Sequence, residues 1–183
     1  MSTKYELTDE AKNIYGVTLH RIRALRDIPS AGVKSGDLGG WIEKESNLCQ
    51  NGNAWVYGNA EVYGDAKVYG NAWVYGNAEV YGDAKVYGNA EACGDAKVCG
   101  DADYMTFKNS WSSGRWFTYT RSNKMWKVGC FYGSGEELIK KAYADSELSG
   151  KCYEAIVRAT ETIEAAKADA ALAKAAGESE AKE

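Results

Sequence analysis

The sequence predicts a mainly β protein built around a short parallel β-helix. The stretch from Gly52 to Met105 consists of nine consecutive hexads, with GNAWVY, GNAEVY and GDAKVY occurring twice in that order before GNAEAC, GDAKVC and GDADYM. Residues 52–69 and 70–87 are identical, so the true period is 18 residues, or three hexads. A fixed period punctuated by Gly-Asn and Gly-Asp is typical of a β-solenoid, whereas each recurring glycine would destabilise an α-helix by about 1 kcal/mol.

The two-residue alternation of a strand assigns a role to each position of the hexad. The valine, as in Val56 and Val62, is expected to point inward and to stack into an aliphatic ladder. The alanine two positions earlier also faces inward, at a corner with little room. Gly-Asn and Gly-Asp occupy the corners, because these residues tolerate left-handed backbone angles. The residues on either side of each valine are therefore predicted to point outward.

The 18-residue period stacks equivalent side chains about 4.8 Å apart on three outer faces. One face is predicted to carry Trp55 above Trp73, beside Tyr57 and Tyr75, as a flat aromatic strip. The second face carries glutamates beside tyrosines, and the third carries lysines beside tyrosines. The charge of two columns reverses in the next coil, which relieves the stacking of like charges. The predicted pairs are Lys97 over Glu79 and Asp103 over Lys85.

The repeat resembles the left-handed parallel β-helix of the hexapeptide-repeat superfamily, in which a small residue stands two positions before an aliphatic one. The run GGWIEKESNLCQNGNAWVYGNAEVYGDAKVYGNA and the later segment WKVGCFYGSGEELIKKAYADSELSGKCYEA are similar to phage and prophage hexapeptide-repeat or polymer-forming proteins. The resemblance covers most of residues 34–157 and implies a left-handed β-helix of about three to four coils. The aromatic residue after the valine departs from the usual pattern. Upstream of Gly52, Ile42 and Leu48 fall on the alanine phase, so the first coil is expected to be irregular or to act as a cap.

Four segments are predicted along the chain. Residues 1–33 contain the strand-like runs KYEL and GVTLHRIRAL, which are expected to cap an exposed strand edge of the β-helix at residues 34–105. Residues 106–165 are predicted to form a hairpin, from RWFTYT and KMWKVGCFY, and two helices. Residues 166–183 form an Ala/Lys/Glu-rich tail with helical propensity but nothing to bury. The first helix is expected to begin at a capping box of Ser134 and Glu137 and to bury Leu138, Ile139, Ala142 and Tyr143.

Composition limits the function classes only broadly. The formal net charge of −4 on 183 residues neither favours nor excludes a nucleic-acid partner. Residues 34–105 carry a net charge of −6 and residues 106–150 one of +3, an asymmetry that could orient a charged partner. The chain shows no apolar run of membrane-span length and no secretory signal, and its five cysteines, without a CxxC pair, are expected to be reduced thiols. We therefore expect a cytoplasmic location in a bacterial host and no membrane contact.

Enzyme chemistry finds little support in the residues. The superfamily that the repeat resembles includes acyltransferases with a histidine base and carbonic anhydrases with three histidine zinc ligands. This chain has one histidine, His20, which lies outside the repeats and is expected to be structural. Gly133-Ser134-Gly135 precedes a predicted helix but lacks the Lys-Ser/Thr of a phosphate-binding P-loop. We expect no catalytic residue, no metal and no cofactor.

Two features indicate a binding surface. The first is the aromatic strip of the solenoid, since large exposed aromatic surfaces usually mark contact sites. The second is the mixture of aromatic and basic residues around the hairpin, which suits a nucleic-acid or an acidic-protein surface, although half of those aromatics must face the core of the hairpin. The candidate partner-binding residues are Trp55, Tyr57, Trp73, Tyr75, Trp111, Arg115, Trp116, Arg121, Lys124, Trp126 and Lys127.

The phage-like resemblance implies a non-catalytic interaction protein that binds and blocks a host macromolecule. The most concrete form of this hypothesis is an inhibitor of CRISPR or of another defence system, with a host protein or a protein–nucleic-acid complex as its partner. A self-associating structural or virion module, dimeric or trimeric, is the alternative from another class. An acyltransferase-like enzyme is the third hypothesis.

Overall fold

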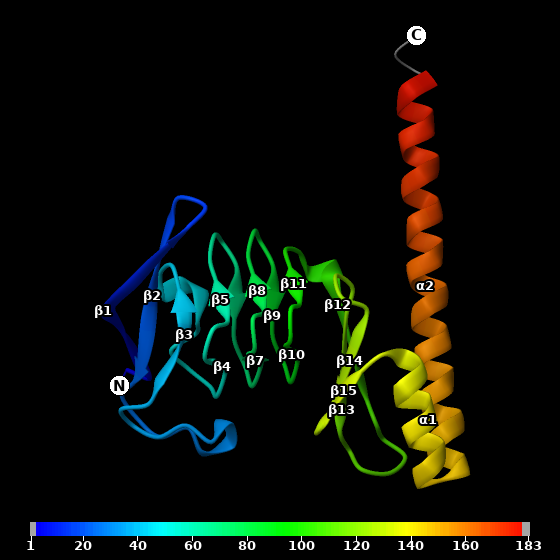
Figure 1. Cartoon of the computed structure of the whole chain (residues 1–183), viewed down its shortest axis with the longest axis horizontal. Helices are drawn as coiled ribbons and strands as arrows, with labels where there is room; N and C mark the ends of the chain where they lie inside the picture. The colour runs from blue at the N-terminus through cyan, green and yellow to red at the C-terminus, as the bar shows by residue number, and fades with distance from the viewer. Residues whose placement is uncertain (1–2, 181–183) are drawn as a thin grey trace. The chain divides into compact units, whose positions relative to one another are not determined.

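The computed structural model describes residues 3–180, with side chains through residue 174. The chain divides into two compact units, Met1–Tyr132 and Gly133–Glu183. A solenoid and the two sheets that flank it belong to the first unit, and two helices make up the second (Figure 1). Among the described residues, no helix is both long enough and apolar enough to cross a membrane.

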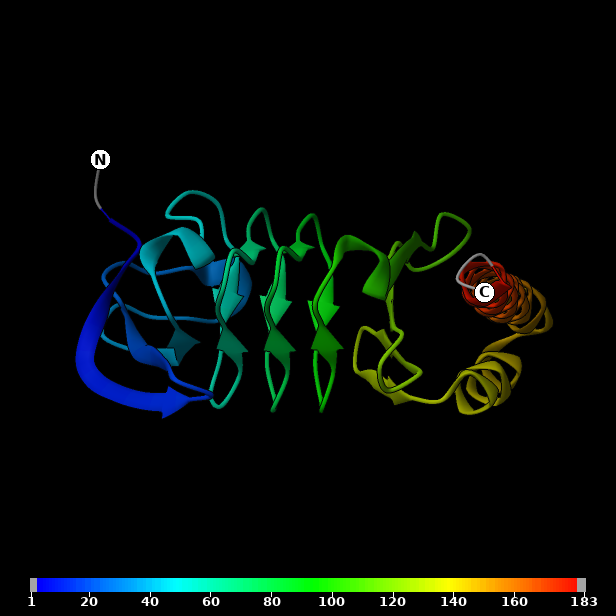
Figure 2. The same cartoon turned by 90° about the horizontal axis from the view of Figure 1, so that it is seen from above.

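The solenoid is a stack of parallel two-residue strands, one from each of eight hexads, which complete about three turns (Figure 2). Each strand pairs with the strand one coil away, so that three sheets run along the stack. The Trp face is β4 (Trp55–Val56), β7 (Trp73–Val74) and β10 (Glu91–Ala92). The Glu face contains β5 (Glu61–Val62), β8 (Glu79–Val80) and β11 (Lys97–Val98), and the Lys face is β6 (Lys67–Val68) and β9 (Lys85–Val86). The sequence prediction of stacked β-helix coils is thereby confirmed.

The core of the solenoid is the predicted ladder of valines and alanines. Every inward valine and alanine of β4–β11, such as Val80 and Ala78, is fully buried or nearly so. The corner glycines from Gly52 to Gly94 adopt positive φ angles. At Gly76, where φ is 73°, an added Cβ would lie 2.9 Å from the backbone nitrogen of Gly94 on the next coil. Glycine is therefore required both by the left-handed backbone and by the close stacking of the coils.

An N-terminal sheet covers one end of the stack, as expected. β1 (Tyr5–Ile14) and β2 (Val17–Ala24) form an antiparallel hairpin, β2 pairs with β3 (Leu38–Ile42), and β3 continues in parallel into β5. Ile42 lies beside Val62 and Leu48 beside Val68, so both residues stack on the valine ladder and not on the alanine phase. This first coil is longer by two residues, and a 3-10 helix (Glu45–Asn47) precedes Leu48. The side-chain amide of the buried Asn47 holds this 3-10 helix against the next coil, because it donates hydrogen bonds to the carbonyls of Gly64 and Ala66.

The ninth hexad does not form a strand of the coil stack, although the predicted β-helix includes it up to residue 105. Gly100 has a φ of −151°, unlike the glycines before it, and a 3-10 helix (Asp101–Asp103) follows. The turn is held by the Asp103 carboxylate, whose Oδ2 accepts hydrogen bonds from the backbone N–H groups of Cys99 and Gly100. Lys85 consequently pairs with Asp101, at 3.6 Å, and not with Asp103. The other predicted charge pair is confirmed, at 3.1 Å between Lys97 Nζ and Glu79 Oε1.

A four-stranded antiparallel sheet covers the other end of the coils. It consists of β12 (Tyr104–Lys108), β13 (Trp116–Thr120), β14 (Met125–Val128) and β15 (Phe131–Gly133), in that order. β13 and β14 are the predicted hairpin, with its turn between Thr120 and Met125. Phe117 and Trp126 form its buried core, with ring centroids 6.4 Å apart and planes at 90°. A hydrogen bond from the Glu91 backbone N–H to Thr118 Oγ1 joins the sheet to the last coil.

The helical unit consists of α1 (Gly135–Asp145) and α2 (Glu147–Glu180). The predicted capping box is confirmed, because Ser134 Oγ accepts from the Glu137 N–H and the Glu137 carboxylate accepts from the Ser134 N–H. Leu138, Ile139 and Ala142 are buried as expected. Tyr143 is not, since it is 37% exposed and its hydroxyl donates to Glu154. α2 continues without a break past residue 166 to residue 180, and residues 181–183 of the predicted tail lie outside the described part.

A lysine is buried at the N-terminal end of the solenoid. The Lys4 side chain is fully buried, and its Nζ donates to the Ala54 carbonyl at 2.8 Å. Burial, opposed by the nearby Cys49 and assisted by Arg26, lowers the pKa of Lys4 to about 8. In the unfolded chain Lys4 would titrate near its usual value of 10.5.

We expect the free energy of unfolding of the wild type, measured relative to that of the Lys4→Met variant, to rise as the pH increases from 8 to about 10, because the tyrosines whose pKa burial raises affect both proteins alike. In this window the unfolded chain binds the Lys4 proton more strongly than the folded chain, so deprotonation favours the folded state by up to about 3 kcal/mol. The Lys4→Met variant should lack this contribution. Urea unfolding of both proteins at half-unit pH steps measures the difference, and parallel curves would show that burial does not perturb Lys4.

Candidate binding groove

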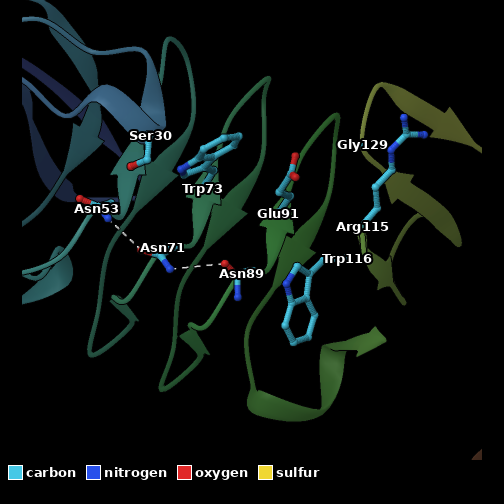
Figure 3. A pocket seen from close by; sticks show the side chains of 9 residues that line it. All are labelled: Ser30, Asn53, Asn71, Trp73, Asn89, Glu91, Arg115, Trp116 and Gly129. Carbon is cyan, nitrogen blue, oxygen red and sulfur yellow. Dashed lines mark hydrogen bonds between the residues drawn. The ribbon is translucent and has the colours of Figure 1, made fainter. Parts of the chain in front are cut away.

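A groove runs along the Trp face of the solenoid between the N-terminal loop and the C-terminal sheet. It consists of two adjoining cavities of about 320 and about 570 Å³, which share Trp73, Glu91 and Gly129. Figure 3 shows the first cavity, with Trp73 and Glu91 on neighbouring strands and Trp116 beyond them. The other lining residues of the first cavity are Ser30, Asn53, Asn71, Asn89, Arg115 and Trp116, and those of the second are Tyr57, Tyr75, Lys127 and Cys130. We call this surface the Trp73 groove.

The aromatic rings of the Trp73 groove stand edge-to-face. The Tyr57 ring lies at 80° to Trp73 and at 87° to Tyr75, with centroids 6.3 Å apart in both pairs. On the other two faces the tyrosines one coil apart are nearly parallel, at 8°. The Trp face differs because the Tyr57 hydroxyl donates to the Ala31 carbonyl, at 2.8 Å, which ties this ring to the N-terminal loop. The predicted flat strip is therefore wrong, and the groove has ridges with slots between them.

A ladder of asparagine amides forms one side of the groove. Asn53 Nδ2 donates to Asn71 Oδ1 at 3.1 Å, and Asn71 Nδ2 donates to Asn89 Oδ1 at 3.4 Å (Figure 3). The ladder arises because the first corner asparagine of each coil recurs every 18 residues. Its last member, Asn89, keeps an amide N–H₂ group for which the described residues provide no acceptor.

The charged side chains of the groove differ in whether they have hydrogen-bond or ion-pair partners. Glu91 Oε2 accepts a hydrogen bond from the Tyr75 hydroxyl, at 2.9 Å, and lies 3.9 Å from Lys127 Nζ. Lys127 also donates to the Gly129 carbonyl and lies over the Tyr75 ring, 5.8 Å from its centroid. Arg115 is exposed, and its guanidinium makes no hydrogen bond or ion pair with any described residue. The uncompensated charge of the groove is thus positive.

Two tyrosines of the groove stay protonated over the physiological pH range. Burial and, to a smaller extent, the neighbouring Glu91 raise the pKa of Tyr57 to about 12. Burial also raises the pKa of Tyr75, with Cys93 and Glu91 acting in the same direction. Both hydroxyls are therefore hydrogen-bond donors, and both already donate, to the Ala31 carbonyl and to Glu91.

Six of the eleven predicted partner-binding residues line the Trp73 groove. They are Tyr57, Trp73, Tyr75, Arg115, Trp116 and Lys127. Trp55, by contrast, is only 1% exposed, because the ring of Tyr5 packs edge-on against it, with centroids 6.3 Å apart. Trp126 is also buried, in the core of the C-terminal sheet. The prediction that these two tryptophans are surface residues is wrong.

The other three predicted residues lie outside the groove. Arg121 Nη1 forms an ion pair with Asp103, at 3.5 Å, and so helps to anchor the C-terminal sheet on the last coil. Lys124 is exposed at the β13–β14 turn, where its φ is 55°. Trp111 packs at a tilted angle on Phe117, 6.2 Å between centroids.

Several groove residues escaped the sequence prediction. Glu91 is not among the predicted partner-binding residues, and Asn53, Asn71 and Asn89 are predicted only as corner residues. The 18-residue recurrence of the three asparagines could have indicated a ladder. No sequence pattern indicates a place in the groove for Ser30, Gly129 or Cys130, because only tertiary contacts bring these residues to the Trp face.

His20 lies in β2, where its Nδ1 is 3.2 Å from the Thr8 carbonyl oxygen, a contact within the N-terminal hairpin. Within the described part of the chain, no group of three or more His, Cys, Asp or Glu side chains is arranged to hold a metal ion. No protein-family model matches the chain, and no curated protein is significantly similar to it.

Proposed function

We propose that this chain is a non-catalytic binding protein that captures a host macromolecule in the Trp73 groove and blocks it. The observation that carries the proposal is the grouping of Trp73, Trp116 and an unpaired Arg115 in one groove. Tryptophan, tyrosine and arginine are the residue types that supply most of the binding energy at protein interfaces.

The groove is also held in a fixed shape before a partner binds. Its floor is part of the hydrogen-bonded coil stack, Tyr57 is tied to the Ala31 carbonyl, and the Glu91 backbone is bonded to Thr118 of the C-terminal sheet. Side chains that are already ordered lose little conformational entropy on binding, which supports a recognition surface.

The finer identity that we propose follows from the hexad pattern. Its resemblance to hexapeptide-repeat proteins of phages and prophages supports an origin in a phage or prophage and action in the cytoplasm of a bacterial host. The partner would be a host protein or a protein–nucleic-acid complex, with a component of CRISPR or another defence system as the most specific candidate.

We expect the Arg115→Glu variant to capture at least tenfold less of its partner from a bacterial host lysate than the wild type. The substitution reverses the charge of the one groove side chain that has no ionic partner in the described part of the chain, at an exposed position where folding should not be disturbed. Quantitative mass spectrometry of the proteins retained on immobilised chain measures the effect.

Lys124→Glu is the matched control, since it makes the same charge change on the same sheet but outside the groove. It should capture the partner as the wild type does. Equal losses for the two variants, or no protein retained specifically by the wild type, would contradict the proposal. Self-association of the chain without any partner would favour the structural-module alternative, and sedimentation of the purified protein detects it.

A further inference from the structure

We propose that the Trp73 groove recognises an extended, proline-rich peptide segment of its partner. A proline ring would lie against Trp73, and an acidic side chain three residues further along would pair with Arg115. This inference rests on the proposed function and specifies the chemistry of the partner.

The first argument is the shape of the aromatic surface. Tyr57 stands at 80–87° to Trp73 and Tyr75, so the rings form ridges. Proline-rich segments in the polyproline II conformation dock into grooves between aromatic ridges, where the pyrrolidine rings fill the slots. A nucleobase needs the open face of a ring for stacking, which edge-to-face pairs offer less well.

The second argument concerns hydrogen bonds. A polyproline II segment has no internal hydrogen bonds, so its carbonyl oxygens must be satisfied by the partner or by water. Besides the Arg115 guanidinium, the amide N–H₂ group of Asn89 at the end of the ladder lacks an acceptor among the described residues. A peptide carbonyl that passes along the asparagine side of the groove would accept a hydrogen bond from this group.

The third argument is electrostatic. Glu91 is already satisfied by Tyr75 and Lys127, whereas Arg115 has no partner among the described residues. The ligand should therefore carry one negative group at the Arg115 end. A polyanion is disfavoured, because residues 34–105 carry a net charge of −6. An acidic side chain in a proline-rich peptide satisfies both conditions.

The fourth argument is spacing. Trp73, Glu91 and the segment of Arg115 and Trp116 follow one another along the groove (Figure 3). Trp73 and Glu91 lie one layer of the stack apart, about 4.8 Å, and Arg115 lies further along, directly before β13. Polyproline II has three residues per turn and rises about 3.1 Å per residue, which places residues i and i+3 on one side about 9.3 Å apart. We therefore place the acidic residue three positions after the proline, a spacing that reaches beyond the layer of Glu91.

The test uses the full chain and two acetylated ten-residue polyproline peptides, one with a single central glutamate and one with lysine in its place. Isothermal titration calorimetry should show saturable binding of the glutamate peptide with a micromolar Kd, and about tenfold weaker binding of the lysine peptide. Arg115→Glu should invert this preference, and Trp73→Ala should abolish binding of both peptides. Lys124→Glu should bind as the wild type does, and circular dichroism verifies that each variant is folded.

Binding of neither peptide, equal binding of both, or a preference that Arg115→Glu leaves unchanged would overturn the inference. So would binding of an oligothymidylate or of a neutral oligosaccharide in the groove when the peptides do not bind. The proposed function fails separately, if capture from lysate is insensitive to Arg115→Glu. Loss of capture in that variant, together with no peptide binding, would leave the groove as the binding site and refute only the proline-rich ligand.

Discussion

The Val80→Asp variant is expected not to form a cooperatively folded solenoid. Val80 is fully buried between Val62 and Val98 on the adjacent coils, and no polar side chain of the valine ladder could pair with a carboxylate there. An isolated buried charge costs several kcal/mol, which is a large part of the roughly 5–15 kcal/mol that stabilises a typical domain. In a solenoid each coil is supported only by its neighbours, so a defect in the middle coil weakens the stack on both sides.

Glu79→Gln is the control for this prediction. Glu79 precedes Val80 in the same strand but points outward, where it pairs with the exposed Lys97. Surface ion pairs contribute little to stability, so this variant should unfold close to the wild-type temperature. Thermal unfolding followed by circular dichroism compares the three proteins. A cooperative Val80→Asp transition near that of the wild type would show that the interior is not the tightly packed ladder described above.

The interior of the solenoid was predictable because a local pattern determines it. In each hexad, valine, alanine and a corner glycine must satisfy the same backbone geometry, and an identical 18-residue block leaves one way to stack them. The capping box of Ser134 and Glu137 was predictable for the same reason, since both residues belong to one turn of helix.

The errors arose where distant residues meet. Trp55 occupies an outward position of its hexad, yet Tyr5, fifty residues earlier in the chain, covers it. Nothing near Trp55 distinguishes it from Trp73, which occupies the same hexad position one coil later and remains partly exposed. The periodic pattern also continues through GDADYM, although the Asp103 carboxylate caps the backbone of Cys99 and Gly100 and ends the stack there.

The candidate site was therefore predictable only in part. Its aromatic residues could be identified from the repeat, and its basic residues from the hairpin. Their proximity could not, because it depends on which face of the stack the C-terminal sheet covers. The covered face is determined by long-range contacts such as the hydrogen bond from the Glu91 backbone N–H to Thr118 Oγ1, and no local sequence pattern predicts these contacts.

Inserting six residues after Tyr87 should therefore dismantle the groove, while inserting 18 should preserve its C-terminal part, from a tryptophan to Glu91 and Arg115. A second copy of GDAKVY at this point supplies another inward valine and alanine, so the core remains continuous. It also rotates every later residue by one face, because three hexads make one coil. Glu91 and Arg115 would then lie on a face different from that of Trp73, and partner capture should fall at least tenfold.

The 18-residue insertion, a third copy of residues 70–87, returns Glu91 to the Trp face one layer further along. A new tryptophan then lies beside Glu91 at the position that Trp73 occupies now, so capture should stay within about threefold of the wild type. Both insertions should unfold at or above the wild-type temperature, since each extends the valine ladder. Both variants keep a continuous core, and they differ in whether Glu91 and Arg115 lie on the same face as a tryptophan. Comparing them therefore separates the effect of stability on capture from the effect of this shared face. If capture were equal in both, the binding surface would have to lie on one side of the insertion point alone, and the Trp73 groove would not be the site.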